Sequence, residues 1–147
     1  MKSLQLSSPS KKFFLWIITI ILVLSFNSCA KKITFLTSTV VPAARGYVKV
    51  TKDNNKNYAI QIKLYNLAEV NRLQPSKETY IVWMVTDQDV TKNIGKVISS
   101  SSFFSRELTG SFETVSSFKP SKIIISAEES ADVQMPGAKV VLSTDRF

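Results

Sequence analysis

The sequence contains no histidine, so acid–base or nucleophilic chemistry would have to come from other side chains, such as its carboxylates, its hydroxyls and its single thiol. Asp87 and Asp89 are two residues apart, so in an extended segment their carboxylates would share one face. Paired carboxylates can act as an acid and a base, or bind calcium. An Asp-x-Asp after an apolar strand is also common turn chemistry. Asp87 and Asp89 are therefore a candidate cation site, with a structural turn as the favoured interpretation.

The other polar groups do not assemble into a catalytic set. Glu128, Glu129 and Asp132 follow an apolar segment, and this pattern favours solvated loop charge. Ser99–Ser102 supplies hydroxyls, but without histidine there is no Ser–His or Cys–His pair and no His-containing zinc site. The sequence therefore predicts a protein that is not an enzyme, with no cofactor and no bound metal.

The one cysteine, Cys29, follows a segment typical of a secretory signal. Residues 1–12 are polar and carry only positive charge, and residues 13–26 are apolar. An apolar run this short is marginal for a hydrocarbon core about 30 Å thick. Ser28 and Cys29 then resemble the end of the bacterial lipobox, where a small residue precedes the cysteine that becomes lipidated. Phe26 and Asn27 depart from the usual lipobox residues.

This resemblance implies a bacterial lipoprotein with a signal peptide over residues 1–28 and a lipidated tether over residues 29–32. Acyl chains such as palmitate on Cys29 would hold the protein in the membrane of the cell envelope, and it would face the periplasm. Two alternatives stay open. The apolar run could remain as an uncleaved membrane anchor, or the protein could be secreted with a free thiol.

Positive charge is spread along the chain instead of being clustered. The formal net charge is +8, and Lys2, Lys11 and Lys12 of the leader account for part of it. A nucleic-acid binder usually shows clustered basic residues with aromatic platforms or a known module. The sequence therefore predicts no nucleic-acid partner.

Residues 33–147 predict one all-β domain, an antiparallel immunoglobulin-like β-sandwich of about seven or eight strands. The expected strands are short runs rich in β-branched and aromatic residues, separated by turn formers. They are Ile33–Thr39, Tyr47–Lys52, Tyr58–Tyr65, Thr79–Thr86, Lys96–Ser99, Ser111–Val115, Lys122–Ala127 and Lys139–Ser143. The second and third alternate around an Asn-rich link and predict a hairpin. The fourth is apolar on both faces and predicts a central strand.

Part of this domain is similar to the extracytoplasmic domain of anti-sigma-K factors. The likeness rests on Tyr80–Val85, the acidic turn at Asp87 and Asp89, Ile94–Val97, Ile123–Ser126, Glu128, Glu129, Pro136-Gly137 and Val140–Ser143. It implies a β-sandwich on the outer side of the cytoplasmic membrane. Members of that family bind a sigma factor through a segment ahead of their membrane helix. Here residues 1–12 precede the apolar run, too few to fold, so the likeness carries a fold and a location.

Aromatic residues give the remaining candidates. Trp83 lies among apolar neighbours and is expected in the core. Phe103, Phe104 and Phe112 flank a polar loop, where they either form an exposed patch that contacts a partner or plug one end of the sandwich.

The sequence thus predicts an exported, membrane-anchored lipoprotein whose sandwich binds or senses an envelope protein or a small ligand. Its contact with membrane lipid would be made through acylated Cys29. The alternatives are a single-pass membrane protein with an anti-sigma-K-factor-like regulatory domain, and a structural or assembly subunit of the envelope.

Overall fold

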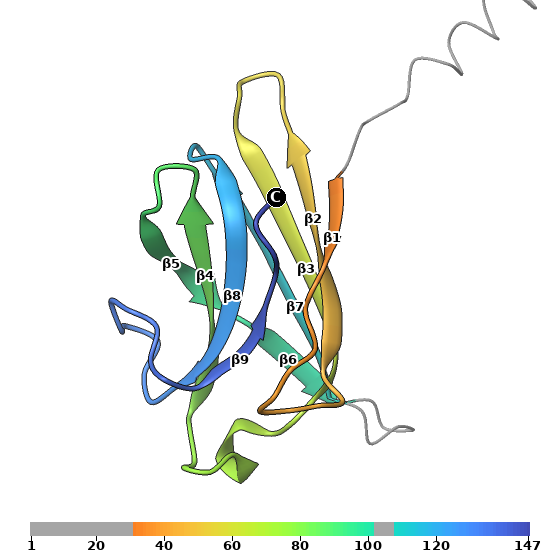
Figure 1. The fold of residues 1–147 in the computed structure, drawn as a ribbon, viewed down its shortest axis with the longest axis vertical. Helices are drawn as coiled ribbons and strands as arrows, with labels where there is room; N and C mark the ends of the chain where they lie inside the picture. The colour runs from red at the N-terminus through yellow and green to blue at the C-terminus, as the bar shows by residue number, and fades with distance from the viewer. Residues whose placement is uncertain (1–30, 102–107) are drawn as a thin grey trace, which may run out of the picture.

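The computed structural model describes residues 31–101 and 108–147 and shows two antiparallel β-sheets packed face to face (Figure 1). One sheet has the strand order β1-β2-β3-β7-β6 and the other has the order β5-β4-β8-β9. This confirms the predicted all-β sandwich. The elements are β1 (Lys31–Thr34), β2 (Arg45–Lys52), β3 (Tyr58–Leu67), a 3-10 turn η1 (Val70–Arg72), β4 (Thr79–Thr86), β5 (Thr91–Lys96), β6 (Ile98–Ser101), β7 (Leu108–Ser116), β8 (Pro120–Glu128) and β9 (Val140–Ser143).

The pairing of the strands bears out two sequence predictions and corrects others. β2 and β3 form the expected hairpin, with Val48 opposite Ile62. β4 lies between β5 and β8 and is buried almost throughout, as its apolar sequence predicted. The described residues form strands β1 to β9, one more than the upper end of the expected seven or eight, because β5 was not predicted. β1 begins at Lys31, two residues before the predicted domain boundary, since Lys31 pairs with Val50.

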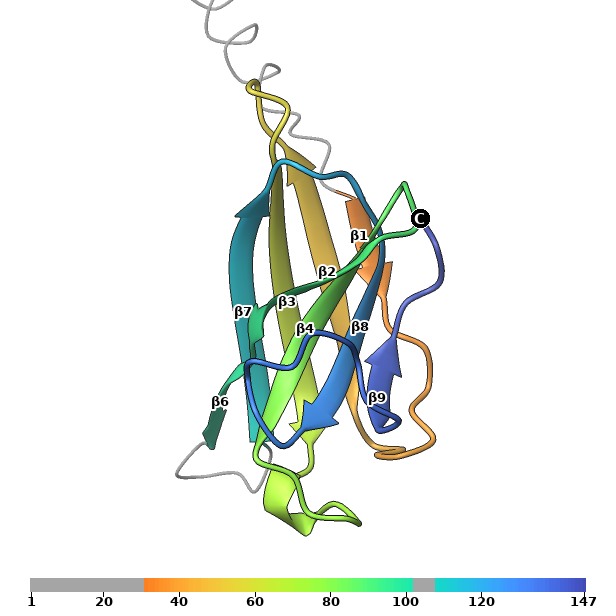
Figure 2. The same ribbon diagram turned by 90° about the vertical axis from the view of Figure 1, so that its left-hand side faces the viewer.

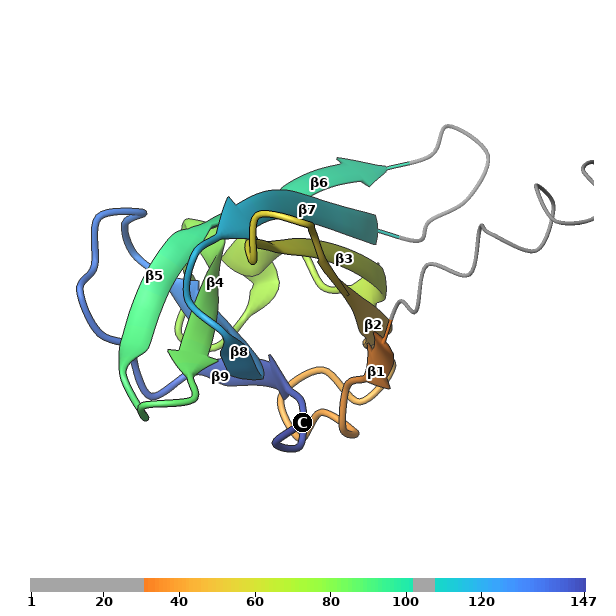
Figure 3. The same ribbon diagram turned by 90° about the horizontal axis from the view of Figure 1, so that it is seen from above.

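Both lateral edges of the sandwich are closed by chain segments that join the two sheets, as the view from above shows (Figure 3). On one side, β5 runs through Val97 directly into β6, which belongs to the other sheet. On the other side, Phe35 after β1 forms a bridge with Thr144 after β9, and the Leu36 N–H donates to the Ser143 carbonyl at 2.8 Å. The open regions are therefore the two ends of the sandwich.

The main core fills the space between the sheets through the alternation of side chains along each strand. Ile60, Ile62 and Leu64 of β3 face Ile123 and Ile125 of β8, and all five are almost fully buried.

Phe112 belongs to this core, so an exposed contact patch that includes Phe112 is wrong. It pairs with Ile62 on β3 and shares its inward face. Its ring packs on Gly95, where an added Cβ would lie 2.8 Å from a ring carbon and where φ is +134°. The other two residues of the predicted patch, Phe103 and Phe104, lie outside the described residues, as does Cys29.

A second apolar layer lies on the outer face of the four-stranded sheet. Ile81 and Trp83 alternate with the core residues Val82 and Met84, so they point away from the main core, yet both are fully buried. The segment 129–139 between β8 and β9 crosses this face (Figure 2). Trp83 is thus buried as predicted, but beneath a loop instead of between the sheets.

Within residues 31–101 and 108–147, no helix is long and apolar enough to cross a bilayer.

Candidate functional site

A buried polar network holds segment 129–139 against the sheet. The Trp83 indole N–H donates to Ser126 Oγ at 2.7 Å, and the Ser126 hydroxyl donates to Glu128 Oε1. The Gly137 N–H donates to the same oxygen at 2.7 Å. An added Cβ at Gly137 would lie 2.7 Å from Glu128 Oε2, so this position suits glycine.

Glu128 is therefore not the solvated loop charge that its acidic neighbourhood predicted. It is the last residue of β8 and is 6% exposed, because Gly137 returns across it. A serine beside a carboxylate can suggest nucleophilic chemistry, but Ser126 is fully buried and no substrate could reach its hydroxyl. The network acts as a structural clamp.

Asn93 of β5 fixes the middle of the same segment. Its side-chain amide donates to the Ala131 carbonyl at 2.9 Å and to the Val133 carbonyl at 3.0 Å. Its Oδ1 accepts from the Gly95 N–H at 3.0 Å. The loop is thus bound to β5 as well as to β8, which keeps Trp83 covered.

Asp87 and Asp89 form the turn between β4 and β5, as the favoured interpretation predicted. Thr86 closes the turn, because its N–H donates to the Val90 carbonyl and its Oγ1 accepts from the Val90 N–H. Asp89 has a φ of 61°, so the segment is not extended and the two carboxylates are not arranged as a strand would place them. Asp89 pairs with Arg146 at 2.5 Å. In the described part of the chain, no group of three or more acidic or cysteine residues could hold a metal ion.

A polar hollow of about 370 Å³ opens at the end of the sandwich opposite the start of β1. Residues of η1 and the first residues of β4 line it, and these elements lie at the lower end of Figure 1. Charged and hydrogen-bonding side chains surround a small apolar floor. The lining residues are Glu69, Val70, Asn71, Lys77, Glu78, Thr79, Tyr80, Val97, Ser99 and Leu108.

Tyr80 is the buried titratable group of the polar hollow. Its hydroxyl donates to the Ala68 carbonyl at 2.9 Å, and this bond ties the start of β4 to the chain leaving β3. Burial raises the pKa of Tyr80 from 10.0 to about 12, since the phenolate would be poorly solvated. Tyr80 therefore stays a hydrogen-bond donor at all ordinary pH values.

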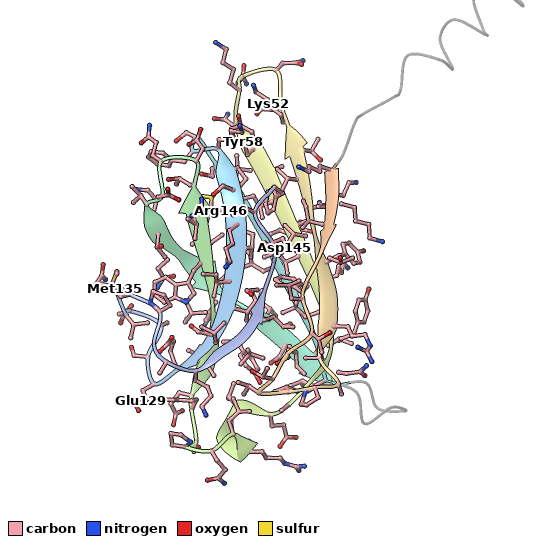
Figure 4. All side chains as sticks on the ribbon, viewed as in Figure 1. Lys52, Tyr58, Glu129, Met135, Asp145 and Arg146 are labelled. Atoms are coloured by element: carbon pink, nitrogen blue, oxygen red, sulfur yellow. The ribbon has the colours of Figure 1, made fainter. Side chains whose placement is uncertain are left out.

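A basic hollow of about 270 Å³ opens at the other end, where the chain enters β1. Three exposed lysines surround apolar side chains contributed by β2, β3, β8 and the last residue. The lining residues are Lys31, Val50, Lys52, Tyr58, Lys119, Pro120 and Phe147. Lys52 and Tyr58 stand at this end in Figure 4.

Aromatic rings stabilise two of the lysines of the basic hollow. The Lys31 amine lies 5.4 Å from the centre of the Phe147 ring, and the Lys52 amine lies 5.7 Å from that of Tyr58. Such contacts are weak in water and strengthen as the site is desolvated. Phe147 is held in place because its N–H donates to the Ser121 carbonyl at 2.9 Å.

No family model, no curated protein and no solved structure matches the chain. The likeness to the extracytoplasmic domain of anti-sigma-K factors therefore stays a prediction.

The residues singled out from the sequence do not converge on one site. Asp87 and Asp89 lie in a turn and Phe112 lies in the core. The two hollows were missed because each is formed by short segments that are distant in sequence. The available signal for the basic hollow was a lysine at the end of one strand and a Lys-Pro pair at the start of another, and both are too common to be diagnostic.

Proposed function

We propose that this protein is a membrane-anchored, non-enzymatic binding or sensing domain of the bacterial envelope, held by lipid on Cys29. The observation that carries the proposal is the position of β1. Among the described residues the first strand starts at Lys31, two residues after the single cysteine. A lipid on Cys29 would thus join the sandwich without a long linker.

The arrangement of the two ends supports a binding role. β1 starts at one end, so a membrane anchor preceding it would leave the polar hollow facing away from the membrane (Figure 1). Asn71 presents an amide there, while the Glu69 carboxylate and the Lys77 amine line the hollow as partners of Arg72 and Glu129. Mixed charges around a small apolar floor suit a polar ligand or a segment of an envelope protein.

The decisive experiment is the intact mass and detergent partitioning of the protein from the membrane fraction, for wild type, Cys29→Ser and Ser28→Ala. We expect wild type to start at residue 29 with added acyl mass, and Cys29→Ser to lack that mass. Ser28→Ala should still be acylated, because it keeps a small residue before the cysteine.

A full-length, unmodified chain in the membrane fraction of both wild type and Cys29→Ser would overturn the lipid anchor. Residues 13–26 would then be retained as the anchor of a single-pass protein. An unmodified chain in the soluble fraction would overturn membrane anchoring altogether.

A further inference from the structure

The basic hollow has the chemistry of a site for an amphiphilic anion. Lys31, Lys52 and Lys119 are exposed at its rim, while Pro120 is buried and Phe147 is half-buried beneath them. Among the described residues, none of these three amines takes part in an ion pair. The site therefore presents positive charge over an apolar floor.

Two of the acidic side chains at this end are engaged elsewhere. Asp53 caps its own turn, since its carboxylate accepts from the Asn57 N–H at 2.7 Å and from Nδ2 at 3.2 Å. Asp89 pairs with Arg146. Asp87 and Asp145 are exposed, but neither lines the hollow. Asp53, Asp87 and Asp145 keep their negative charge nearby, and the Asp87 N–H donates to the Lys119 carbonyl at 3.1 Å. No carboxylate side chain lines the basic hollow itself, so the charge at its rim comes from its lysines.

The length of the connection to Cys29 places the hollow relative to a membrane. Ala30 alone separates Cys29 from Lys31, and an extended chain spans at most about 3.5 Å per residue, so the connection reaches roughly 7 Å. An acylated Cys29 lies in the interfacial region of the bilayer. Lys31, which lines the hollow, must then lie among the lipid headgroups.

We propose that the basic hollow binds the headgroup of an anionic phospholipid of the anchoring membrane. The phosphate would lie among the Lys31, Lys52 and Lys119 amines, and the glycerol and first acyl carbons would contact Val50, Pro120 and Phe147. This inference rests on the proposed membrane anchor. Its physical advantage is that acyl chains together with a basic patch hold a protein at a membrane in a fixed orientation.

The first test is amine labelling of the protein as purified from the membrane fraction and placed in lipid nanodiscs, read residue by residue by mass spectrometry. Discs of phosphatidylcholine are compared with discs in which about a third of the lipid is phosphatidylglycerol. Lys49 and Lys63, on the outer face of the five-stranded sheet, serve as references. We expect labelling of Lys52 and Lys119 to slow about fivefold or more with phosphatidylglycerol, and the references to change less than twofold. Equal slowing at all four lysines would overturn the proposal.

The second test compares two variants that lose the same charge. Phosphatidylglycerol retained by detergent-released protein is measured by native mass spectrometry for Lys52→Gln/Lys119→Gln and for Lys49→Gln/Lys63→Gln. A lysine near an anionic surface contributes about fivefold in affinity, so we expect roughly a 25-fold loss in the first variant and less than twofold in the second. Equal losses would mean diffuse attraction and would overturn the site.

Two further outcomes distinguish a failure of the lipid assignment from a failure of the membrane anchor. If inorganic phosphate protects Lys52 and Lys119 in phosphatidylcholine discs as well as phosphatidylglycerol does, the site takes free phosphate and the lipid assignment is overturned. If the protein does not enter discs, the anchor is overturned instead. Protection by soluble short-chain phosphatidylglycerol would then still decide whether the hollow recognises the headgroup.

Discussion

The two ends of the sandwich are built from different interactions. At the end with the polar hollow, buried side-chain hydrogen bonds fix the chain, through Tyr80 to Ala68 and through Ser126 and Gly137 to Glu128. At the end with the basic hollow, the Ser121 hydroxyl makes buried hydrogen bonds to the Val85 and Thr86 carbonyls. The charged side chains of that end interact in exposed positions: the Asp53 turn cap, the Asp89–Arg146 pair, and lysines over aromatic rings.

This difference indicates which end of the sandwich is rigid and which end can change its side-chain contacts. A buried donor or acceptor that loses its partner lowers the free energy of unfolding by about 1–3 kcal/mol. An exposed ion pair contributes only about 0–1 kcal/mol. The polar end should therefore hold one geometry, as a selective binding site needs. The basic end can lose or rearrange its charges at little cost in stability, which suits contact with a fluid lipid surface.

The largest expected effect is at Glu128. Glu128→Ala removes the acceptor of both the Ser126 hydroxyl and the Gly137 N–H, so we expect the free energy of unfolding to fall by about 2–4 kcal/mol. The measurement is urea denaturation. Segment 129–139 should also exchange its amide hydrogens faster, because one of its attachments to the sheet is lost.

Glu129→Ala is the matched control for this change. Glu129 is adjacent and acidic, but its carboxylate is exposed and pairs with Lys77 at 3.0 Å. Its loss should lower stability by less than about 1 kcal/mol. If the two alanine variants were equally stable, the contrast between buried and exposed interactions would be wrong.

How far the sequence predicts this molecule depends on the range of the interactions. The β2–β3 hairpin and the central strand β4 were predictable, because alternation and apolar runs are written in consecutive residues. β5 was missed because Asn93 and Gly95 are typical turn residues. In the fold, a register shift in the β4–β5 pairing and the Asn93 side chain accommodate them.

The candidate sites were less predictable for the same reason. Glu128 looks solvated in the sequence because Glu129 follows it, and its burial depends on Gly137 returning nine residues later. The basic hollow joins Lys31, Lys52 and Lys119, which come from three separate segments. Nothing in the local sequence around any of these lysines indicates that they share a rim.

Tyr80→Phe gives an intermediate effect that also depends on pH. Loss of the bond to Ala68 should lower the free energy of unfolding by about 1 kcal/mol at neutral pH. The pKa of Tyr80 is raised to about 12 in the folded protein from 10.0, so the unfolded chain releases this proton first as pH rises. Wild-type stability should therefore decrease between about pH 10 and 12, by at most about 1.4 kcal/mol per pH unit from this group.

The Tyr80→Phe variant lacks this ionisation. The difference in free energy of unfolding between wild type and the variant should therefore narrow as pH rises from about 10 to about 12. Below about pH 9 the gap should stay constant, which serves as the internal control. Urea denaturation at each pH is the measurement. A gap that widens above pH 10 would show that the Tyr80 hydroxyl is not buried as a neutral donor.

The smallest effect is expected at Asp89. Asp89→Asn removes an exposed ion pair with Arg146, and asparagine still tolerates the φ of 61° at this position. Stability should change by less than about 0.5 kcal/mol. Asp89→Val removes the same charge and also places a β-branched residue in the left-handed region. It should therefore lower the free energy of unfolding by about 1–2 kcal/mol. Thermal denaturation of the two variants therefore separates charge from backbone. A loss in Asp89→Asn as large as that in Asp89→Val would mean that the charge pair holds this end together, and the basic end would then be as dependent on specific side-chain contacts as the polar end.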